Sequence, residues 1–238
     1  MKISDKIILA LDVADRNSAI EIVKKFKDHI DIFKVGSELF TSAGPDVVRE
    51  INSMGKKVFL DLKFHDIPNT VAKSVRSAAE MEVFMLNVHA SGGSEMMKRA
   101  AQAIAEVSSE KNINKPKLIA VTVLTSIDQT ILQREVGIEK AIKTHVTHLA
   151  ELARQSGLDG VVASPQETPV IRNACGKDFL IVTPGIRPSW AEADDQKRTM
   201  TPAEAISKGA DYLVMGRAIL SQPDPLDALK RIEEELSY

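Results

Sequence analysis

The sequence predicts an α/β protein of the (β/α)8 TIM-barrel class, in one domain that spans residues 1–238. Eight short apolar runs alternate with longer amphipathic stretches along the whole chain. No Pro/Gly/Ser-rich linker interrupts this alternation. The length of 238 residues also fits the ~250 residues that are typical of a single barrel. Together these observations favour one closed barrel over two small domains.

The strands are predicted from runs rich in Val, Ile, Leu and Phe, which are typical of a parallel sheet covered by helices. Eight such strands, each followed by a helix, favour closure into a barrel. An open doubly wound sheet is the alternative, but it would need a glycine-rich turn after the first strand, and LALDVADRN contains no glycine. In chain order, the predicted strands are residues 7–12, 30–35, 56–61, 83–89, 117–124, 158–164, 179–184 and 211–216.

The helices are predicted where apolar residues recur at spacings of three and four. The clearest helix start is Thr201-Pro202-Ala203-Glu204, because Thr is a good N-cap, Pro suits the first helical position and Glu can complete a capping box. A further helix is expected to begin just past Gly216. In chain order, the predicted helices before this last one are residues 17–28, 44–54, 69–80, 93–110, 140–156, 202–209 and, after it, 226–236.

The composition argues against several functional classes. Hydrophobic residues at 44% and charged residues at 27% are typical of a globular protein. A net charge of −2 predicts no bulk attraction to nucleic acid or to an anionic membrane, and no segment approaches the ~20 apolar residues of a membrane span. Cys175 is the only cysteine, and the first apolar run is too short for a secretory signal. We therefore expect a soluble, cytoplasmic protein with no nucleic-acid or membrane partner.

Charged residues gather where the predicted strands end, which is the end of a barrel that carries its chemistry. Asp61, Lys63 and Asp66 follow the third strand within six residues. Lys34 lies inside the apolar run IDIFKVG, where a lysine is costly unless it is paired. Asp12 ends the first strand, and helix capping is an equal alternative for it. The joint pattern predicts a catalytic site rather than a surface ion pair.

The ends of the seventh and eighth strands predict a phosphate site. Gly185 and Gly216 allow the backbone to approach a ligand, while Arg187 and Arg217 supply guanidinium groups that suit a phosphate. This corner is where barrels frequently bind phosphate. The polar stretch 189–200 is expected to act as a lid that closes over the ligand, with Gln196 reaching toward it.

Several blocks of the sequence together resemble the bacterial orotidine 5′-phosphate decarboxylases. The ten-residue block DLKFHDIPNT is highly specific, and the resemblance covers every predicted strand end except the sixth. The blocks that carry it are LALDVAD (9–15), FKVG (33–36), DLKFHDIPNT (61–70), LTS (124–126), TPGIRP (183–188) and MGRAI (215–219).

The resemblance implies conversion of orotidine monophosphate to UMP and carbon dioxide, the final step of pyrimidine (UMP) biosynthesis, without a metal or a cofactor. It implies that Lys63 is the proton donor to carbon 6 and that Lys34, Asp61 and Asp66 complete a charged network. It also implies a homodimer with shared active sites. The further substrate contacts that it implies are Asp12 at the ribose, Thr125 at the pyrimidine, Arg187, Gln196, Gly216 and Arg217 at the phosphate end, Pro184 beside them, and Ile67 and Thr70 with Asp66 from the second subunit.

These residue types suit the chemistry because loss of carbon dioxide from a ring carbon leaves a poorly delocalised carbanion. A fixed ammonium group at Lys63 can stabilise that charge and then deliver the proton. Neighbouring carboxylates should keep this lysine protonated. Repulsion between Asp61 and the departing carboxylate is an alternative contribution that the sequence leaves open.

Two other functions are weighed against this one. A magnesium-dependent sugar-phosphate decarboxylase or hexulose-phosphate synthase of the same suprafamily shares the Asp-x-Lys-x-x-Asp block. Such enzymes bring a metal-binding carboxylate from the second strand, where this chain has Lys34. A non-catalytic phosphate-binding barrel is the other alternative, but it has no need of four alternating charges. The sequence therefore favours the metal-free decarboxylase.

Overall fold

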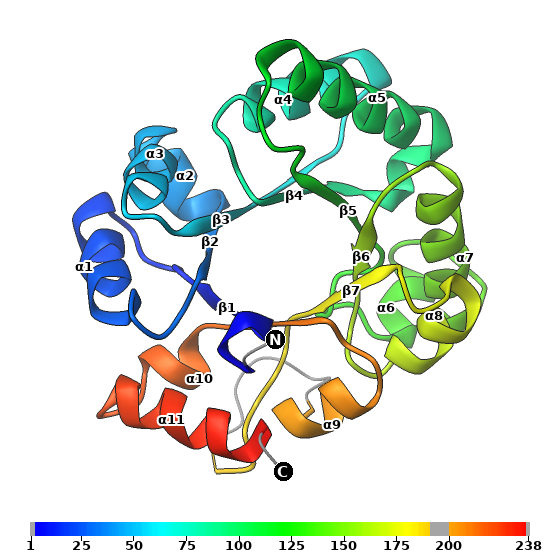
Figure 1. Ribbon diagram of the computed structural model, residues 1–238. Coiled ribbons are helices and arrows are strands. Elements are labelled where there is room, and N and C mark those ends of the chain that lie inside the picture. The colour runs from blue at the N-terminus through cyan, green and yellow to red at the C-terminus, as the bar shows by residue number, and fades with distance from the viewer. Residues whose placement is uncertain (1–2, 191–199, 237–238) are drawn as a thin grey trace.

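The structure is a computed structural model that describes residues 3–190 and 200–236. Its eight strands are parallel and form a closed barrel in chain order, because β8 pairs with β1 between Met215 and Leu9. Figure 1 looks along the barrel axis from the end where the strands begin, with the helices outside. The strands are β1 (Ile7–Ala10), β2 (Ile32–Gly36), β3 (Lys57–Phe64), β4 (Met85–His89), β5 (Lys117–Val121), β6 (Gly160–Val162), β7 (Leu180–Thr183) and β8 (Tyr212–Met215).

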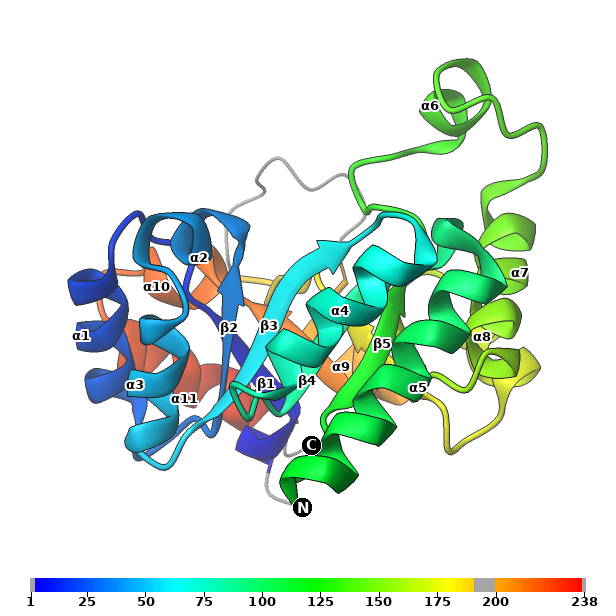
Figure 2. The ribbon, with the colours of Figure 1, turned by 90° about the horizontal axis from the view of Figure 1, so that it is seen from above.

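The helices lie between consecutive strands, and the predicted barrel class is confirmed. Figure 2 shows α6 standing above the rim at which the strands end. No helix in residues 3–190 and 200–236 is long and apolar enough to cross a membrane. The helices are η1 (Ile3–Lys6), α1 (Arg16–Phe26), α2 (Ser37–Ala43), α3 (Asp46–Ser53), α4 (Pro68–Ala79), η2 (Ala90–Gly92), α5 (Gly93–Lys111), α6 (Gln129–Arg134), α7 (Ile142–Gln155), α8 (Thr168–Cys175), α9 (Pro202–Ser207), α10 (Arg217–Leu220) and α11 (Pro225–Leu236).

Some predicted boundaries are wrong for physical reasons. The observed helix is shorter than the predicted helix 44–54, because Gly44 caps α2 with a φ of 67° and Pro45 is the N-cap of α3, which begins at Asp46. Helices α2, α6 and α8 are not predicted, because each is at most eight residues long and presents too few apolar positions for a clear period. The third strand continues to Phe64, three residues beyond its predicted end at Asp61.

Two apolar groups hold the barrel together. The larger one lies between the strands and the helices, and it includes fully buried Leu9, Phe33 and Leu60. The smaller one is formed by the alternate positions of the strands, which face the barrel interior. Its buried members are Ile8, Ile32, Phe59, Met85, Ile119 and Val182. Because side chains fill this interior, it is a packed core rather than a pore.

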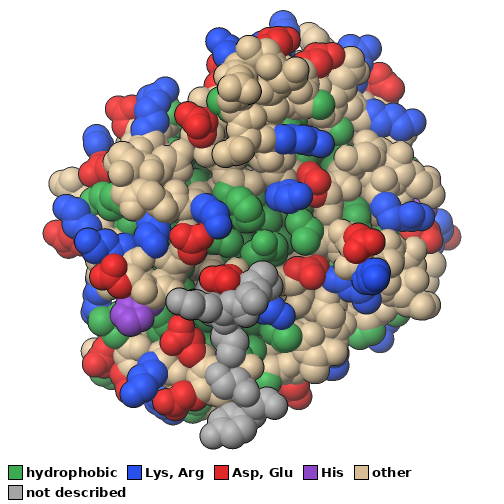
Figure 3. All heavy atoms as spheres, in the orientation of Figure 1, with side chains coloured by type: hydrophobic (Ala, Val, Ile, Leu, Met, Phe, Trp, Pro, Cys, Tyr) green, Lys and Arg blue, Asp and Glu red, His purple; other side chains and the backbone are tan. Residues whose placement is uncertain are grey.

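Local signals fix the helices that border the site. The predicted capping box of α9 is confirmed: the Thr201 Oγ1 accepts from the Glu204 N–H at 3.3 Å, and the Thr201 N–H donates to Glu204 Oε2 at 3.1 Å. Helix α10 begins at Arg217, directly past Gly216, as predicted. Figure 3 shows the end of the barrel at which the strands begin, where charges of both signs are interspersed around central hydrophobic side chains.

Candidate active site

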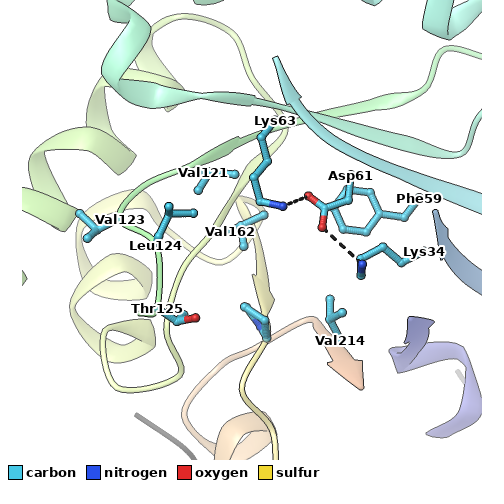
Figure 4. A pocket seen from close by; sticks show the side chains of 11 residues that line it. Lys34, Phe59, Asp61, Lys63, Val121, Val123, Leu124, Thr125, Val162 and Val214 are labelled. Atoms are coloured by element: carbon cyan, nitrogen blue, oxygen red, sulfur yellow. Dashed lines mark hydrogen bonds and ion pairs between the residues drawn. The ribbon is translucent and has the colours of Figure 1, made fainter. Parts of the chain in front are cut away.

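Four charged side chains meet where β1, β2 and β3 end. The Lys34 Nζ lies 2.8 Å from Asp12 Oδ1 and 3.6 Å from Asp61 Oδ2. The Lys63 Nζ lies 2.7 Å from Asp61 Oδ1. Parallel pairing brings these residues together, because Ala10 pairs with Lys34 and Gly36 pairs with Asp61. Figure 4 shows the Asp61 carboxylate between the two ammonium groups.

The contact between Asp61 and Lys63 depends on an irregularity in β3. Leu60 pairs with Leu86 and Phe64 pairs with Val88, so three residues of β3 stand opposite Asn87 alone. Lys63 has a φ of 52°, in the left-handed region that a lysine rarely occupies. In a regular strand, alternation alone would place two side chains two residues apart on the same face. The contact is present, but a bulge produces it.

The charge of Asp61 is stabilised by its surroundings. Burial of this carboxylate alone would raise its pKa. The positive charges of Lys34 and Lys63 lower it, and hydrogen bonds from Lys63 and Asn87 lower it further. The net result is a pKa below the usual value for an aspartate. At neutral pH the site therefore contains an ionised Asp61 between two lysines.

Replacing Asp61 by asparagine is expected to flatten the acid side of the stability curve. The folded-state pKa is depressed, so the stabilisation is complete above the unfolded-state pKa of about 3.9 and is lost as the pH falls through the lower folded value. Urea unfolding between about pH 2 and 6 measures this as a steeper fall of the unfolding free energy in the wild type than in D61N. The matched control is D46N, which removes an exposed carboxylate paired with Arg49. Equal slopes in the wild type and D61N would contradict the depressed pKa.

Two adjoining cavities open beside this cluster, and they share Lys34, Pro184 and Val214. The first, of about 180 Å³, is mainly apolar, with Asp61 and Lys63 on its wall (Figure 4). The second, also of about 180 Å³, is polar. Its lining includes Asp12, Gly185, Arg187, Gly216 and Arg217. The pair forms a long pocket with an apolar lobe and a cationic lobe.

A family model described as the orotidine 5′-phosphate decarboxylase / HUMPS family matches residues 5–232. The chain belongs to this family. It is 51% identical over 236 residues to an orotidine 5′-phosphate decarboxylase of Moorella thermoacetica, covering 99% of this chain and 94% of the relative. A decarboxylase of the same name from Syntrophotalea carbinolica is 53% identical over 232 residues, covering 98% and 95%.

A solved structure agrees with these relatives. The crystal structure of an orotidine 5′-phosphate decarboxylase from Lactobacillus acidophilus superposes with a TM-score of 0.85 at 38% sequence identity. The match covers 98% of this chain and 100% of that one. The resemblance of the strand-end blocks to the decarboxylase family is thus confirmed over nearly the whole chain.

The structure brings most of the residues expected in a decarboxylase of this family to the pocket. Thr125 lines the apolar lobe, Pro184 lines both lobes, and the two arginines line the cationic lobe. Asp66, Ile67 and Thr70 are exposed and do not join the cluster within a single chain. The Asp66 carboxylate instead accepts a hydrogen bond from the Ile67 N–H at 2.6 Å. Gln196 lies outside the described residues, as does most of the expected lid.

Two residues to which the sequence analysis assigned no role adjoin the charged cluster. Asn87 is fully buried and bonds to both Asp61 and Lys63. A polar residue within the apolar run MLNVH is the signal that could have indicated it. A Cβ on Gly36 would lie 3.1 Å from the Lys34 Nζ, so a larger residue there would press on the ammonium group.

The histidines beside the site form a ring contact rather than a metal centre. The His65 and His89 ring centroids are 5.3 Å apart. Burial, the neighbouring His65 and the Lys63 ammonium lower the pKa of His89. Within the part of the chain that the structure describes, no group of three or more His, Cys, Asp or Glu side chains is arranged to hold a metal ion.

Proposed function

We propose that this chain converts orotidine 5′-monophosphate to UMP and carbon dioxide, the final step of pyrimidine nucleotide synthesis. The observation that carries this proposal is the Lys63 ammonium, 2.7 Å from Asp61, on the wall of an apolar lobe that continues into a cationic one. The names of the two relatives and of the Lactobacillus structure support it.

The shape and charge of the pocket fit the parts of this nucleotide. Phe59, Val121 and Val162 offer apolar surface to a flat pyrimidine ring. Arg187 and Arg217 offer guanidinium groups to the phosphate at the other end. Lys34 lines both lobes, and Asp12 lies beside it in the cationic lobe, where the ribose hydroxyls would be placed. Binding energy from the phosphate, far from the reacting carbon, can then assist the reaction.

Lys63 is the proton donor in this proposal. The bond between carbon 6 and the carboxylate breaks, and its electron pair stays on carbon 6. The positive charge of the ammonium stabilises that pair, and one of its protons passes to the carbon. The neutral amine then regains a proton from water. Asp61 holds the ammonium in place through the 2.7 Å contact.

The reaction is proposed to need no metal and no cofactor. The two carboxylates at the pocket, Asp12 and Asp61, both face the Lys34 ammonium, at 2.8 and 3.6 Å. A divalent cation would have to displace that group and would be repelled by it. This arrangement favours the decarboxylase over the magnesium-dependent members of the suprafamily.

The enzyme is proposed to work as a homodimer with shared sites. Asp66 is exposed in the single chain, and the neighbouring Ile67 is 67% exposed, so an apolar residue stands uncovered beside it. A second subunit that covers Ile67 would bring its own Asp66 and Thr70 toward the first subunit's Lys63.

We also propose a cytoplasmic location, because a single, buried Cys175 suits a reducing compartment.

Purified protein is expected to consume orotidine monophosphate at a rate that excess EDTA does not change. The substrate's absorbance follows the reaction directly, and K63A serves as the matched inactive protein. A magnesium-dependent relative would instead lose activity in EDTA and regain it with Mg²⁺. Activity only after Mg²⁺ is restored would refute the metal-free mechanism, and no conversion under either condition would refute the decarboxylase function.

A further inference from the structure

Asn87 on β4 is a buried polar residue in contact with two members of the charged cluster. Its side chain is fully buried. Its Oδ1 accepts from the Lys63 backbone N–H at 2.8 Å, and its Nδ2 donates to Asp61 Oδ1 at 2.7 Å. The same Asp61 oxygen accepts from the Lys63 Nζ at 2.7 Å. The Asn87 amide therefore contacts both the backbone of Lys63 and the carboxylate of Asp61.

The amide takes the place of a missing part of the strand ladder. Asn87 is the only residue of β4 opposite the three β3 residues from Asp61 to Lys63, so the main chain of β4 cannot satisfy every group of the bulge. A buried backbone N–H without a partner is costly, and the Asn87 Oδ1 supplies that partner to Lys63.

The bulge holds Lys63 in a conformation that its own residue type disfavours. A non-glycine residue with a φ of 52° persists only where its surroundings enforce that backbone. The bond from the Lys63 N–H to Asn87 fixes the direction of that peptide. The bond from Asn87 to Asp61 fixes the carboxylate against which the ammonium rests.

We propose that Asn87 is a positioning residue, which holds the β3 bulge so that the Lys63 ammonium and the Asp61 carboxylate meet in reactive geometry. This deepens the proposed decarboxylase function and rests on it. Asparagine is suited to the task because one side chain carries both an acceptor and a donor. Aspartate at this position would set a second carboxylate against Asp61, whereas alanine would leave the Lys63 backbone N–H without this partner and remove one hydrogen bond from Asp61.

The test is the kinetics of N87A and N87D compared with N52A. Asn52 is the matched control because its Nδ2 also makes a structural bond, to the Met81 carbonyl at 2.8 Å, away from the pocket. We expect kcat of N87A to fall about 100-fold, the effect of displacing a reacting group by about 1 Å, and N87D to lose more. The Kd of UMP should change less than about threefold, because the product needs no proton donor. N52A should keep the wild-type kcat.

Two further readouts separate positioning from general stabilisation. The acid-side fall of kcat should move to higher pH in N87A, because Asp61 loses a hydrogen bond that favours its charged form while Lys34 and Lys63 remain beside it. A crystal structure of N87A should show Lys63 out of its left-handed backbone or away from Asp61. A lower kcat with Lys63 displaced supports the proposal.

A wild-type kcat in N87A, or a lower kcat with Lys63 and Asp61 unmoved, would overturn it. If N87A does not fold, N87S, whose shorter hydroxyl cannot reach both partners, decides the question by the same measurements. A wild-type protein without decarboxylase activity would refute the proposed function instead. In that case the positions of Lys63 in the wild-type and variant crystal structures test the role of Asn87 by themselves.

Discussion

Replacing Lys63 by alanine is expected to lower kcat for orotidine monophosphate by about 10⁴-fold or more. The substitution removes the proposed proton donor, a role worth about 10² to 10⁴-fold, and also the charge proposed to stabilise the carbanion. Binding of UMP should be nearly unchanged, because the cationic lobe keeps Arg187 and Arg217. Steady-state turnover and calorimetric binding of UMP measure the two expectations separately.

Lys57 provides the matched control on the same strand. It begins β3 at the opposite end of the barrel, where its Nζ pairs with Asp31 at 2.7 Å and lies 5.4 Å from the centroid of the Phe84 ring. K57A removes the same side chain from the same strand, so it should keep wild-type turnover. A K63A protein with near-normal turnover would refute the assigned role. Loss of UMP binding in K63A would show that the lysine serves binding rather than the chemical step.

Mixing two inactive variants, K63A and D66A, is expected to restore about a quarter of the wild-type activity. In a dimer with shared sites, Lys63 of one chain works with Asp66 of the other, so each hybrid dimer has one intact site and one doubly damaged site. Random exchange makes about half of the dimers hybrid, and half of their sites are intact. Turnover measured after unfolding and refolding the mixture gives the recovered fraction.

A second mixture shows that any recovery comes from sharing between subunits. Asp61 and Lys63 touch within one chain, so hybrids of K63A with D61A contain no intact site and should stay inactive. Native mass spectrometry of differently tagged chains verifies that hybrids form in both mixtures. Proven hybrids of K63A and D66A without activity would contradict the shared site and would leave Asp66 with a role in its own chain.

The barrel could be predicted from the sequence because each buried strand is a compact apolar run, which can be recognised from its own residues without knowledge of its neighbours. The helices α2 and α6 could not, since each buries a single residue, Leu39 or Leu132, and gives no period to recognise. Their short lengths are fixed by caps such as Gly44 and by the loops around them.

The charged cluster was also predictable, because strand ends converge in a barrel whatever the exact register. The bulge at Lys63 was not, since it depends on how β3 aligns with β4, which is a property of two strands and not of either sequence run. For the same reason Asn87 had no assigned partner until the structure placed it between Asp61 and Lys63. The expected role of Asp66 concerns a second chain and remains a prediction.

Lys34 has a consequence for redesign of this enzyme. Its ammonium belongs to both lobes of the pocket, and it contacts Asp12 on one side and Asp61 on the other. The cationic lobe and the apolar lobe are therefore coupled through one side chain. Replacing Asp12 would remove the partner on one side of Lys34, which changes the electric field at Asp61 and so at Lys63. Libraries that vary specificity should randomise these positions together.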